Sequence, residues 1–265
     1  RLSKGRRMSN LFPKMNNYRT PPGSTSMLVR RQATPLFYFQ VFMIVLKASR
    51  LAKRGRYDDA QWIKSSLNTI KALESVGGRF EIDNAPSYRK PESSCVFIAN
   101  HMSILETFVL PCLIQPHCDV TFVVKESLID YPFFRHVMRS RNPIVVGRDN
   151  PRQDLRTVLQ EGQKLLKDNV SVVIFPQTTR SVDFEPSNFN TLGVKLAARA
   201  NVPVIPIALK TDAWELGRKL KDFGKIRPDK TVHICFGEPL RVQGSGKPEH
   251  RIVVDFIMTR LKDWQ

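Results

Sequence analysis

A histidine and a glutamate spaced five residues apart are the first candidates for chemistry in this sequence. His101 follows the apolar run Cys95–Ala99, whose length and flanks predict a buried strand. Glu106 lies about one turn into a helix that begins near Ser103. A carboxylate at that position can reach back to the imidazole, and a histidine held through one ring nitrogen can use the other to take a proton from a hydroxyl. The pair therefore predicts general-base chemistry at a strand-to-helix turn, where α/β proteins usually place their active sites.

The same glutamate has a second, purely structural interpretation. Ser103 and Glu106 match the S-x-x-E capping box, in which the glutamate side chain binds backbone N–H groups at the start of a helix. A single histidine before a helix is also more often structural than catalytic, and a short motif is only a hypothesis until its surroundings are known. These residues by themselves leave both interpretations open.

Polar and cationic groups follow three more predicted strands. They are Lys125 after Val120–Val124, Arg148 after Ile144–Val146, and Gln177, Thr178, Thr179 and Arg180 after Val170–Phe175. Each group taken alone fits an ordinary solvated loop. If the strands are neighbours, however, Lys125, Arg148 and Arg180 converge near His101. Cations that converge beside a base indicate a phosphate-bearing substrate, and arginine suits two-pronged contact with phosphate.

The elements that must position these residues alternate between strand and helix. The remaining strands are predicted at Phe80–Ile82, Val204–Leu209 and Val232–Phe236. Helices are predicted at Ile104–Ile114, Phe133–Arg139, Arg152–Lys167, Asn188–Ala200 and Glu249–Lys262. This alternation predicts an α/β domain over residues 79–265, with a mostly central β-sheet flanked by helices.

The first part of the chain carries most of the positive charge. Residues 1–57 contain 13 Lys or Arg and no Asp or Glu, against a formal net charge of +18 for all 265 residues. Such asymmetry indicates a polyanionic partner, which is an anionic membrane surface, nucleic acid or an acidic carrier. Residues 1–34 are polar and rich in proline, so we expect a basic flexible arm, although an acid-free start also resembles an organelle transit peptide.

The sequence of residues 35–78 predicts two helices that dock on a membrane surface. Thr34 and Pro35 form a helix start, and the apolar segment Leu36–Leu46 spans roughly 16 Å as a helix, about half the hydrocarbon thickness of a bilayer. A basic collar follows, which consists of Lys47, Arg50, Lys53, Arg54 and Arg56. We expect a monotopic helix on the cytoplasmic face; the alternative is a core helix with a solvated basic end. A second helix is predicted at Asp58–Val76.

The sequence lacks the motifs that are typical of several other classes of function. The chain has no P-loop, no G-x-G-x-x-G motif and no Cys/His spacing typical of zinc sites. Its cysteines form no C-x-x-C pair, which favours reduced thiols in a protein that faces the cytosol. Because the basic excess lies beside an apolar helix and no aromatic–basic interleaving occurs, we expect no nucleic-acid partner.

Four blocks in order give the chain a resemblance to the glycerolipid acyltransferases. They are Asn100-His101 with Glu106, the Arg148 block, Phe175–Ser181 and Val202–Pro206, within residues 60–240. The resemblance implies transfer of an acyl group from acyl-CoA or acyl carrier protein to a lysophospholipid hydroxyl, with 1-acylglycerol-3-phosphate as the leading acceptor. It also implies that His101 is the general base and Glu106 its orienting carboxylate, in an HX4D-like motif. Arg148 and Arg180 would bind phosphate with help from Lys125, and neither a metal nor a cofactor would be required.

The chain departs from the family pattern at several positions. Glu106 stands where the family usually has Asp, and Gln177 and Thr178 stand where it usually has Glu and Gly. Arg135 and Asn142 occupy positions where glycine is usual. Gln177 keeps a hydrogen-bonding carbonyl but loses the charge. These departures keep two alternatives open, a lipid-binding relative without activity and an acyltransferase with a different acceptor.

Overall fold

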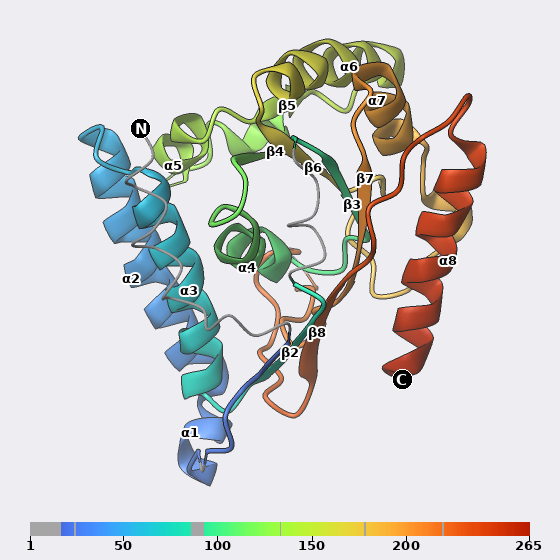
Figure 1. Ribbon diagram of the computed structural model, residues 1–265. Coiled ribbons are helices and arrows are strands. Elements are labelled where there is room, and N and C mark those ends of the chain that lie inside the picture. Colours follow the sequence, from blue (N-terminus) through green and yellow to red (C-terminus); the bar gives the residue numbers. More distant parts are fainter. Residues whose placement is uncertain (1–16, 24, 86–92, 133, 178, 219) are drawn as a thin grey trace.

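The structure is a computed structural model that describes residues 17–23, 25–85, 93–132, 134–177, 179–218 and 220–265. These residues form one eight-stranded sheet in the order β1-β2-β8-β7-β3-β6-β4-β5 (Figure 1). The strands are β1 Tyr18–Arg19, β2 Arg79–Asp83, β3 Val96–Ala99, β4 Val120–Lys125, β5 Ile144–Val146, β6 Ser171–Ile174, β7 Val204–Lys210 and β8 Thr231–Phe236. The predicted α/β class, with a central sheet flanked by helices, is confirmed.

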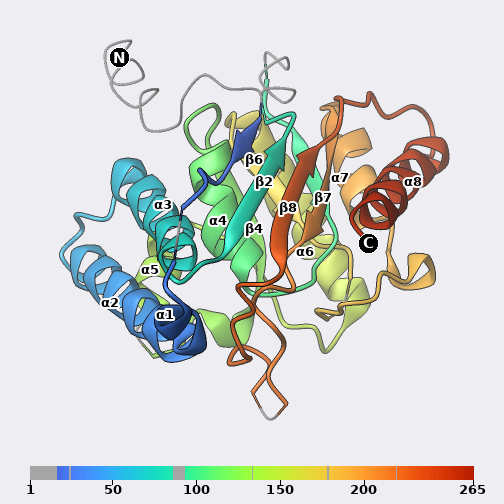
Figure 2. The ribbon, with the colours of Figure 1, turned by 90° about the horizontal axis from the view of Figure 1, so that it is seen from below.

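Helices cover both faces of this sheet. In Figure 1, α2, α3, α4 and α5 lie on one side and α6, α7 and α8 on the other, and Figure 2 shows α2 and α3 side by side, opposite α8. The helices are α1 Met27–Arg31, α2 Ala33–Lys53, α3 Asp59–Ser75, α4 Leu105–Ile114, α5 Arg135–Ser140, α6 Pro151–Lys167, α7 Leu192–Ala200 and α8 Lys247–Asp263, with 3₁₀ turns at Glu126–Leu128 and Pro186–Asn188. Alternate residues of β3 point to opposite cores, Phe97 toward α4 and Ile98 toward α7, which is the pattern of a strand buried on both faces.

Part of the segment expected to be a flexible arm, residues 1–34, is folded. β1 pairs antiparallel with β2 at one edge of the sheet, and α1 precedes α2. The Tyr18 hydroxyl donates a hydrogen bond to Glu74 on α3, with 2.8 Å between the oxygens. The expectation is therefore wrong for this stretch, because strand pairing and a side-chain contact order it despite its polar composition. Residues 1–16 lie outside the described residues.

Helix α2 is longer than the apolar segment Leu36–Leu46 suggested. Its 21 residues correspond to about 31 Å of helix, and the basic collar forms its last turns and the residues just beyond them. Within the described residues, α2 is the one helix that is long and apolar enough to cross a membrane, by length and composition only. The expected helix start is also shifted, because Thr34 lies inside α2 and its hydroxyl accepts a hydrogen bond from the Ile226 N–H (3.1 Å).

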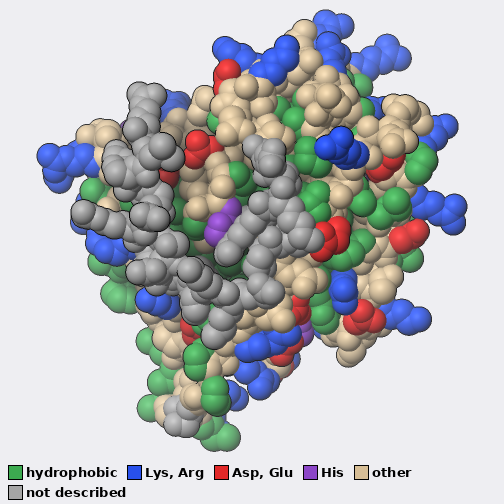
Figure 3. All heavy atoms as spheres, viewed as in Figure 1, with side chains coloured by type: hydrophobic (Ala, Val, Ile, Leu, Met, Phe, Trp, Pro, Cys, Tyr) green, Lys and Arg blue, Asp and Glu red, His purple; other side chains and the backbone are tan. Residues whose placement is uncertain are grey.

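The two faces of α2 differ in their surroundings. Phe37, Val41 and Val45 are buried, whereas Phe39 and Phe42 keep 66% and 50% of their surface exposed. Figure 3 shows hydrophobic side chains along the edge of the molecule where α1 and α2 lie, with Lys and Arg side chains around much of the remaining outline. Helix α2 therefore presents apolar side chains both to the protein and to its exterior.

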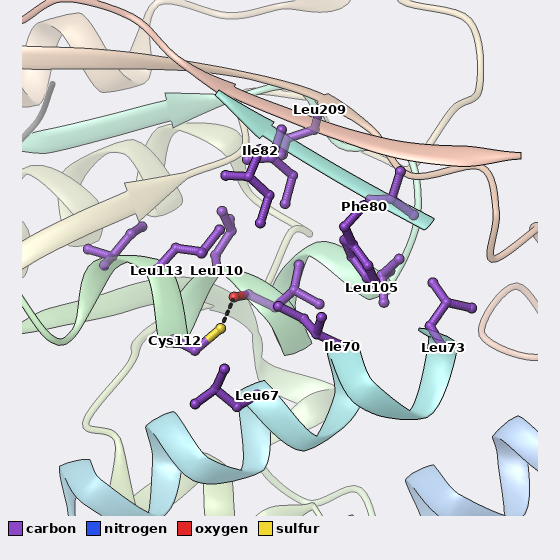
Figure 4. Close-up of a cluster of buried hydrophobic side chains, with 14 of the residues drawn as sticks. Leu67, Ile70, Leu73, Phe80, Ile82, Leu105, Leu110, Cys112, Leu113 and Leu209 are labelled. Atoms are coloured by element: carbon purple, nitrogen blue, oxygen red, sulfur yellow. Dashed lines mark hydrogen bonds between the residues drawn. The ribbon is translucent and has the colours of Figure 1, made fainter. Parts of the chain in front are cut away.

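Helices α2 and α3 share one hydrophobic core with the sheet. Figure 4 shows side chains from three elements pointing toward one another: Leu67, Ile70 and Leu73 of α3, Leu110 and Leu113 of α4, and Phe80 and Ile82 of β2. Phe37 of α2 packs edge-to-face on Trp214, with ring centroids 4.9 Å apart. Burying such a side chain stabilises a fold by roughly 1.5–3 kcal/mol. The boundary expected between residues 78 and 79 therefore does not separate two independently packed units.

Four parallel strands bring the candidate residues to one edge of the sheet. β3, β6, β4 and β5 are consecutive neighbours and run parallel, so their carboxyl ends lie together. His101 follows β3, Gln177 follows β6, Lys125 ends β4 and Arg148 follows β5. Their strands are therefore neighbours, as the expected convergence of these residues required.

Candidate active site

His101 and Glu106 are in direct contact. Nδ1 of the imidazole lies 2.5 Å from Oε2 of the carboxylate. Glu106 is fully buried, and the His101 side chain keeps 14% of its surface exposed. Because an ionised carboxylate only accepts hydrogen bonds, this network assigns the imidazole proton to Nδ1. The other ring nitrogen, Nε2, is then able to accept a proton.

The capping interpretation of Glu106 holds in part: its carboxylate binds backbone N–H groups as a capping box requires, but the N-cap residue of α4 is Ile104 and not Ser103. Oε1 of its carboxylate accepts hydrogen bonds from the backbone N–H groups of Met102 and Ser103, each at 2.8 Å. The Ser103 hydroxyl accepts a hydrogen bond from the Leu105 N–H (3.1 Å). Glu106 thus holds the turn that leads into α4 with one oxygen and His101 with the other, so the two interpretations describe different atoms of one side chain.

The loop after β6 holds the backbone of His101 on two sides. The His101 N–H donates to Oε1 of the buried Gln177 (2.5 Å), and the His101 carbonyl accepts from the Ser181 N–H (3.0 Å). The Phe175 ring stacks on the imidazole, with centroids 4.3 Å apart and planes inclined by 17°. These contacts fix the histidine from a second strand, which limits rotation of its ring.

Arg180 lies in this loop and forms an ion pair with Asp222. The neighbouring Thr179 accepts a hydrogen bond from Lys221 through its hydroxyl (2.9 Å). Lys221 and Asp222 belong to the connection between β7 and β8, and no sequence pattern pointed to them. Thr178, which was also predicted to line the site, lies outside the described residues.

Arg148 lies at the same edge, in a backbone conformation with φ of +69°. The Arg148 N–H donates to Asp154 (2.9 Å). Burial lowers the pKa of Arg148; the nearby Asp154 carboxylate opposes this change and the Arg180 guanidinium adds to it. The two arginines therefore lie within electrostatic reach of each other. Lys125 ends β4 with an exposed side chain, and the described contacts do not connect it to His101 or to the arginines.

One departure from the family pattern has a simple structural explanation. Asn142 adopts φ of +46°, the left-handed conformation that glycine adopts most easily. Asparagine is one of the few other residues that enter this region at low cost. The loop before β5 therefore keeps a left-handed turn without glycine. Arg135, the second such position, is the first residue of α5.

Two polar contacts at this edge were not predicted from the sequence. The Asn100 side chain donates to the Leu209 carbonyl and accepts from the Leu209 N–H, each at 2.8 Å, which joins the end of β3 to β7. The hydroxyl of Thr211 donates to Glu106 Oε1 at 2.6 Å. Thr211 directly follows β7, which pairs parallel with β3, and its place after a predicted strand was the only available signal. The site therefore combines a histidine base, a buried carboxylate and nearby cations, an arrangement suited to deprotonating a hydroxyl near an anion.

The comparisons with known proteins agree with this arrangement. Residues 79–210 match the sequence model of the acyltransferase family. The 1-acyl-sn-glycerol-3-phosphate acyltransferase of Pseudomonas aeruginosa is 27% identical over 193 residues, which is 73% of this chain and 70% of that protein. The enzyme of the same name from Haemophilus influenzae is 28% identical over 167 residues, 63% of this chain and 66% of that protein.

A solved structure has the same fold. The crystal structure of the 1-acyl-sn-glycerophosphate acyltransferase PlsC from Thermotoga maritima matches with a TM-score of 0.66 and 18% identity. The match covers 89% of this chain and 96% of that chain. The matched residues 79–210 contain His101, Glu106, Arg148 and Arg180, as well as β7. The chain belongs to the acyltransferase family.

Proposed function

We propose that the protein is a 1-acylglycerol-3-phosphate O-acyltransferase that works at a membrane surface. It moves a fatty acyl group from acyl-CoA or acyl carrier protein to the free hydroxyl of the acceptor and forms phosphatidic acid. The names of the similar proteins support this substrate class. The observation that carries the proposal is the contact of His101 with a fully buried Glu106, at the edge of the sheet that also holds Arg180.

In the proposed reaction, Nε2 of His101 removes the proton of the acceptor hydroxyl while the oxygen attacks the thioester carbonyl. The tetrahedral oxyanion then collapses, the carbon–sulfur bond breaks, and the imidazolium returns its proton to the departing thiolate. Glu106 holds the imidazole in the required tautomer and stabilises the imidazolium, as the carboxylate does in a Ser-His-Asp triad. This route forms no acyl-enzyme.

The acceptor phosphate binds the cations beside the base in this proposal. Arg180 is the main contact and exchanges its ion pair with Asp222 for the phosphate, while Arg148 and Lys125 add positive potential. Thr179 lies in the same loop as Arg180. Interactions of this kind, made equally in the ground state and the transition state, appear in the acceptor KM more than in kcat.

The alternative of an inactive lipid-binding relative was motivated by Gln177. In the structure its carbonyl oxygen accepts the His101 N–H, a contact that a glutamate oxygen would make in the same way. The departure therefore retains the atom that holds the base. This observation favours an active enzyme over a binding protein.

The test measures acyl transfer by the purified full chain from acyl-CoA to 1-acylglycerol-3-phosphate, with 1-acylglycerol as the matched acceptor without phosphate. His101→Ala should lower turnover by about 10²–10⁴-fold, the usual contribution of a general base. His250→Ala, on α8 at the opposite face, is the matched control and should stay near wild type. Wild-type activity in His101→Ala would refute the mechanism, and equal use of both acceptors would refute the phosphate site.

Action at a membrane surface is the second part of this proposal. The exposed apolar side chains of α2, Leu36, Phe39, Phe42 and Met43, lie on the helix whose last turns carry the basic collar, and all five collar residues are exposed. Each such cation contributes about 1 kcal/mol near an anionic membrane surface. Because the opposite face of α2 is buried against the protein, we expect α2 to lie in the interface with its outer face in one leaflet.

Liposome sedimentation of the full chain tests this orientation. Phe39→Ser with Phe42→Ser should weaken binding to anionic liposomes, whereas Ile252→Ser with Met258→Ser, on the similarly exposed face of α8, should not. Substitution is preferable to deletion of residues 1–57, because α2 contributes Phe37 to the core. Equal binding by both double variants would exclude the outer face of α2 as the membrane contact.

A further inference from the structure

We infer that Thr211 is a positioning residue for the His101–Glu106 pair, an inference that rests on the proposed function. Thr211 directly follows β7 and is fully buried. Its hydroxyl lies 2.6 Å from Glu106 Oε1, the oxygen that does not contact the imidazole. Thr211 thus acts on the base through the carboxylate, without contact with the reacting atoms.

The hydrogen bonds around Thr211 run in one direction. The Leu105 N–H donates to the Ser103 hydroxyl (3.1 Å), and the Ser103 hydroxyl donates to the Thr211 oxygen (2.9 Å). A hydroxyl has one proton to give. Because the Thr211 oxygen accepts from Ser103, its own proton is directed to Glu106. The series ends at the carboxylate, whose other oxygen holds Nδ1 of His101.

Thr211 supplies a constraint that the start of α4 does not. The other two donors to Oε1 are the N–H groups of Met102 and Ser103, which hold the carboxylate only relative to the turn that directly precedes its own helix. Thr211 directly follows β7 and so fixes the carboxylate relative to the next strand of the sheet. The Asn100 side chain forms two hydrogen bonds with the backbone of Leu209 and so keeps the carboxyl ends of β3 and β7 aligned.

The length of the glutamate makes this constraint useful. Glutamate has one more rotatable bond than aspartate, so its carboxylate loses more conformational freedom when it is held in one position. Three donors on one oxygen of Glu106 hold that extra torsion and aim the other oxygen at His101. A misplacement of about 1 Å in catalytic geometry can cost roughly 10²-fold in rate. Thr211 thus compensates for the longer side chain.

Thr211→Val keeps the shape of the side chain and removes the hydroxyl, and it is the central variant of the test. It should lower kcat by about 10- to 100-fold, which corresponds to the free energy that a hydrogen bond to a charged group contributes. The acceptor KM should stay nearly unchanged. Thr211→Ser restores a hydroxyl and should recover most of the activity. Thr69→Val, at a fully buried threonine of α3 whose hydroxyl donates to the Ser65 carbonyl, is the matched control for stability and activity.

A double-mutant cycle separates positioning from a general effect on the fold. In a Glu106→Asp background, Thr211→Val should cause less than about a 3-fold further loss, because contacting residues that act as one unit give non-additive effects. Full activity of Thr211→Val, no rescue by Thr211→Ser, or equal losses in both backgrounds would each overturn the inference. If His101→Ala is as active as wild type in the same assay, the proposed function fails instead.

Discussion

Replacing Glu106 with glutamine separates its two roles, because the change keeps the shape of the side chain and alters one atom. Oε1 of Glu106 accepts three hydrogen bonds and Oε2 accepts one, from Nδ1 of His101. A glutamine has a single amide oxygen, which is best placed at the three donors. Its NH₂ group then faces Nδ1 and forces that nitrogen to become an acceptor. The imidazole proton moves to Nε2, the nitrogen that must take the proton of the hydroxyl.

The expected loss is therefore large and falls on kcat. In a Ser-His-Asp triad, the corresponding change of Asp to Asn leaves the geometry intact and lowers kcat by roughly 10⁴-fold through the wrong tautomer. We expect a loss of the same order in Glu106→Gln, with a smaller change in the acceptor KM. The amide oxygen of the glutamine still accepts from the N–H groups of Met102 and Ser103 before α4, so the thermal unfolding temperature should fall only modestly.

The assay follows release of the free thiol from acyl-CoA in the presence of 1-acylglycerol-3-phosphate, together with thermal unfolding. Glu74→Gln is the matched control, because Tyr18 and Thr20 both donate to one oxygen of Glu74 and an amide oxygen can accept from both. If Glu106→Gln keeps turnover within about 10-fold of wild type while remaining folded, the tautomer argument is refuted. A loss of stability with no loss of kcat per folded molecule would leave Glu106 as a helix cap alone.

Three further substitutions test the geometry around the base. Glu106→Asp retracts the carboxylate by about 1.5 Å, one carbon–carbon bond, so it can no longer keep both His101 and the cap contacts, and kcat should fall about 10²-fold. Asp222→Asn frees Arg180 from its ion pair and should lower the acceptor KM about 2- to 5-fold, since a partly exposed pair contributes up to about 1 kcal/mol. Gln177→Met removes the acceptor of the His101 N–H and should lower kcat about 10-fold.

Each of these outcomes has a direct measurement. Steady-state kinetics with varied acceptor separate the KM effect of Asp222→Asn from the kcat effects of the other two. Sequence alone makes aspartate acceptable at position 106, because the resembled family usually carries it, so full activity of Glu106→Asp would show that α4 shifts to restore both contacts. An unchanged acceptor KM in Asp222→Asn would argue against Arg180 as the phosphate contact. Wild-type kcat in Gln177→Met would show that the loop after β6 does not hold the base.

The sequence was most informative where the structure depends on local patterns. The run Cys95–Ala99 is apolar throughout, as expected for a strand buried on both faces, and β3 occupies four of its five residues. Glu106 lies within hydrogen-bonding reach of His101 because the intervening residues form a turn into α4. The arrival of the candidate residues at one edge required only that their parallel strands be neighbours, which is the usual arrangement of an α/β protein.

Two features near the start of the chain gave no such local signal. β1 has two residues, which is too short for any alternation of polar and apolar side chains to be visible. Helix α2 continues to Lys53 because Ala, Lys, Arg and Leu all favour helix, whereas the hydropathy of the segment drops after Leu46. Hydropathy therefore located the apolar part of α2 but did not indicate where the helix ends.

The site residues that escaped prediction are joined by contacts between distant parts of the chain. Thr211 meets Glu106 across 105 positions, and Asp222, in the connection between β7 and β8, meets Arg180 in the loop after β6. Hydrogen-bond partners at such separations depend on how strands are ordered, which no single stretch of sequence encodes. By contrast, Gln177 differs from the family pattern by residue type and yet presents a carbonyl oxygen to the His101 N–H. A motif is therefore better compared by the atoms that make its contacts than by its letters, since an oxygen retained at position 177 preserves the support of the base.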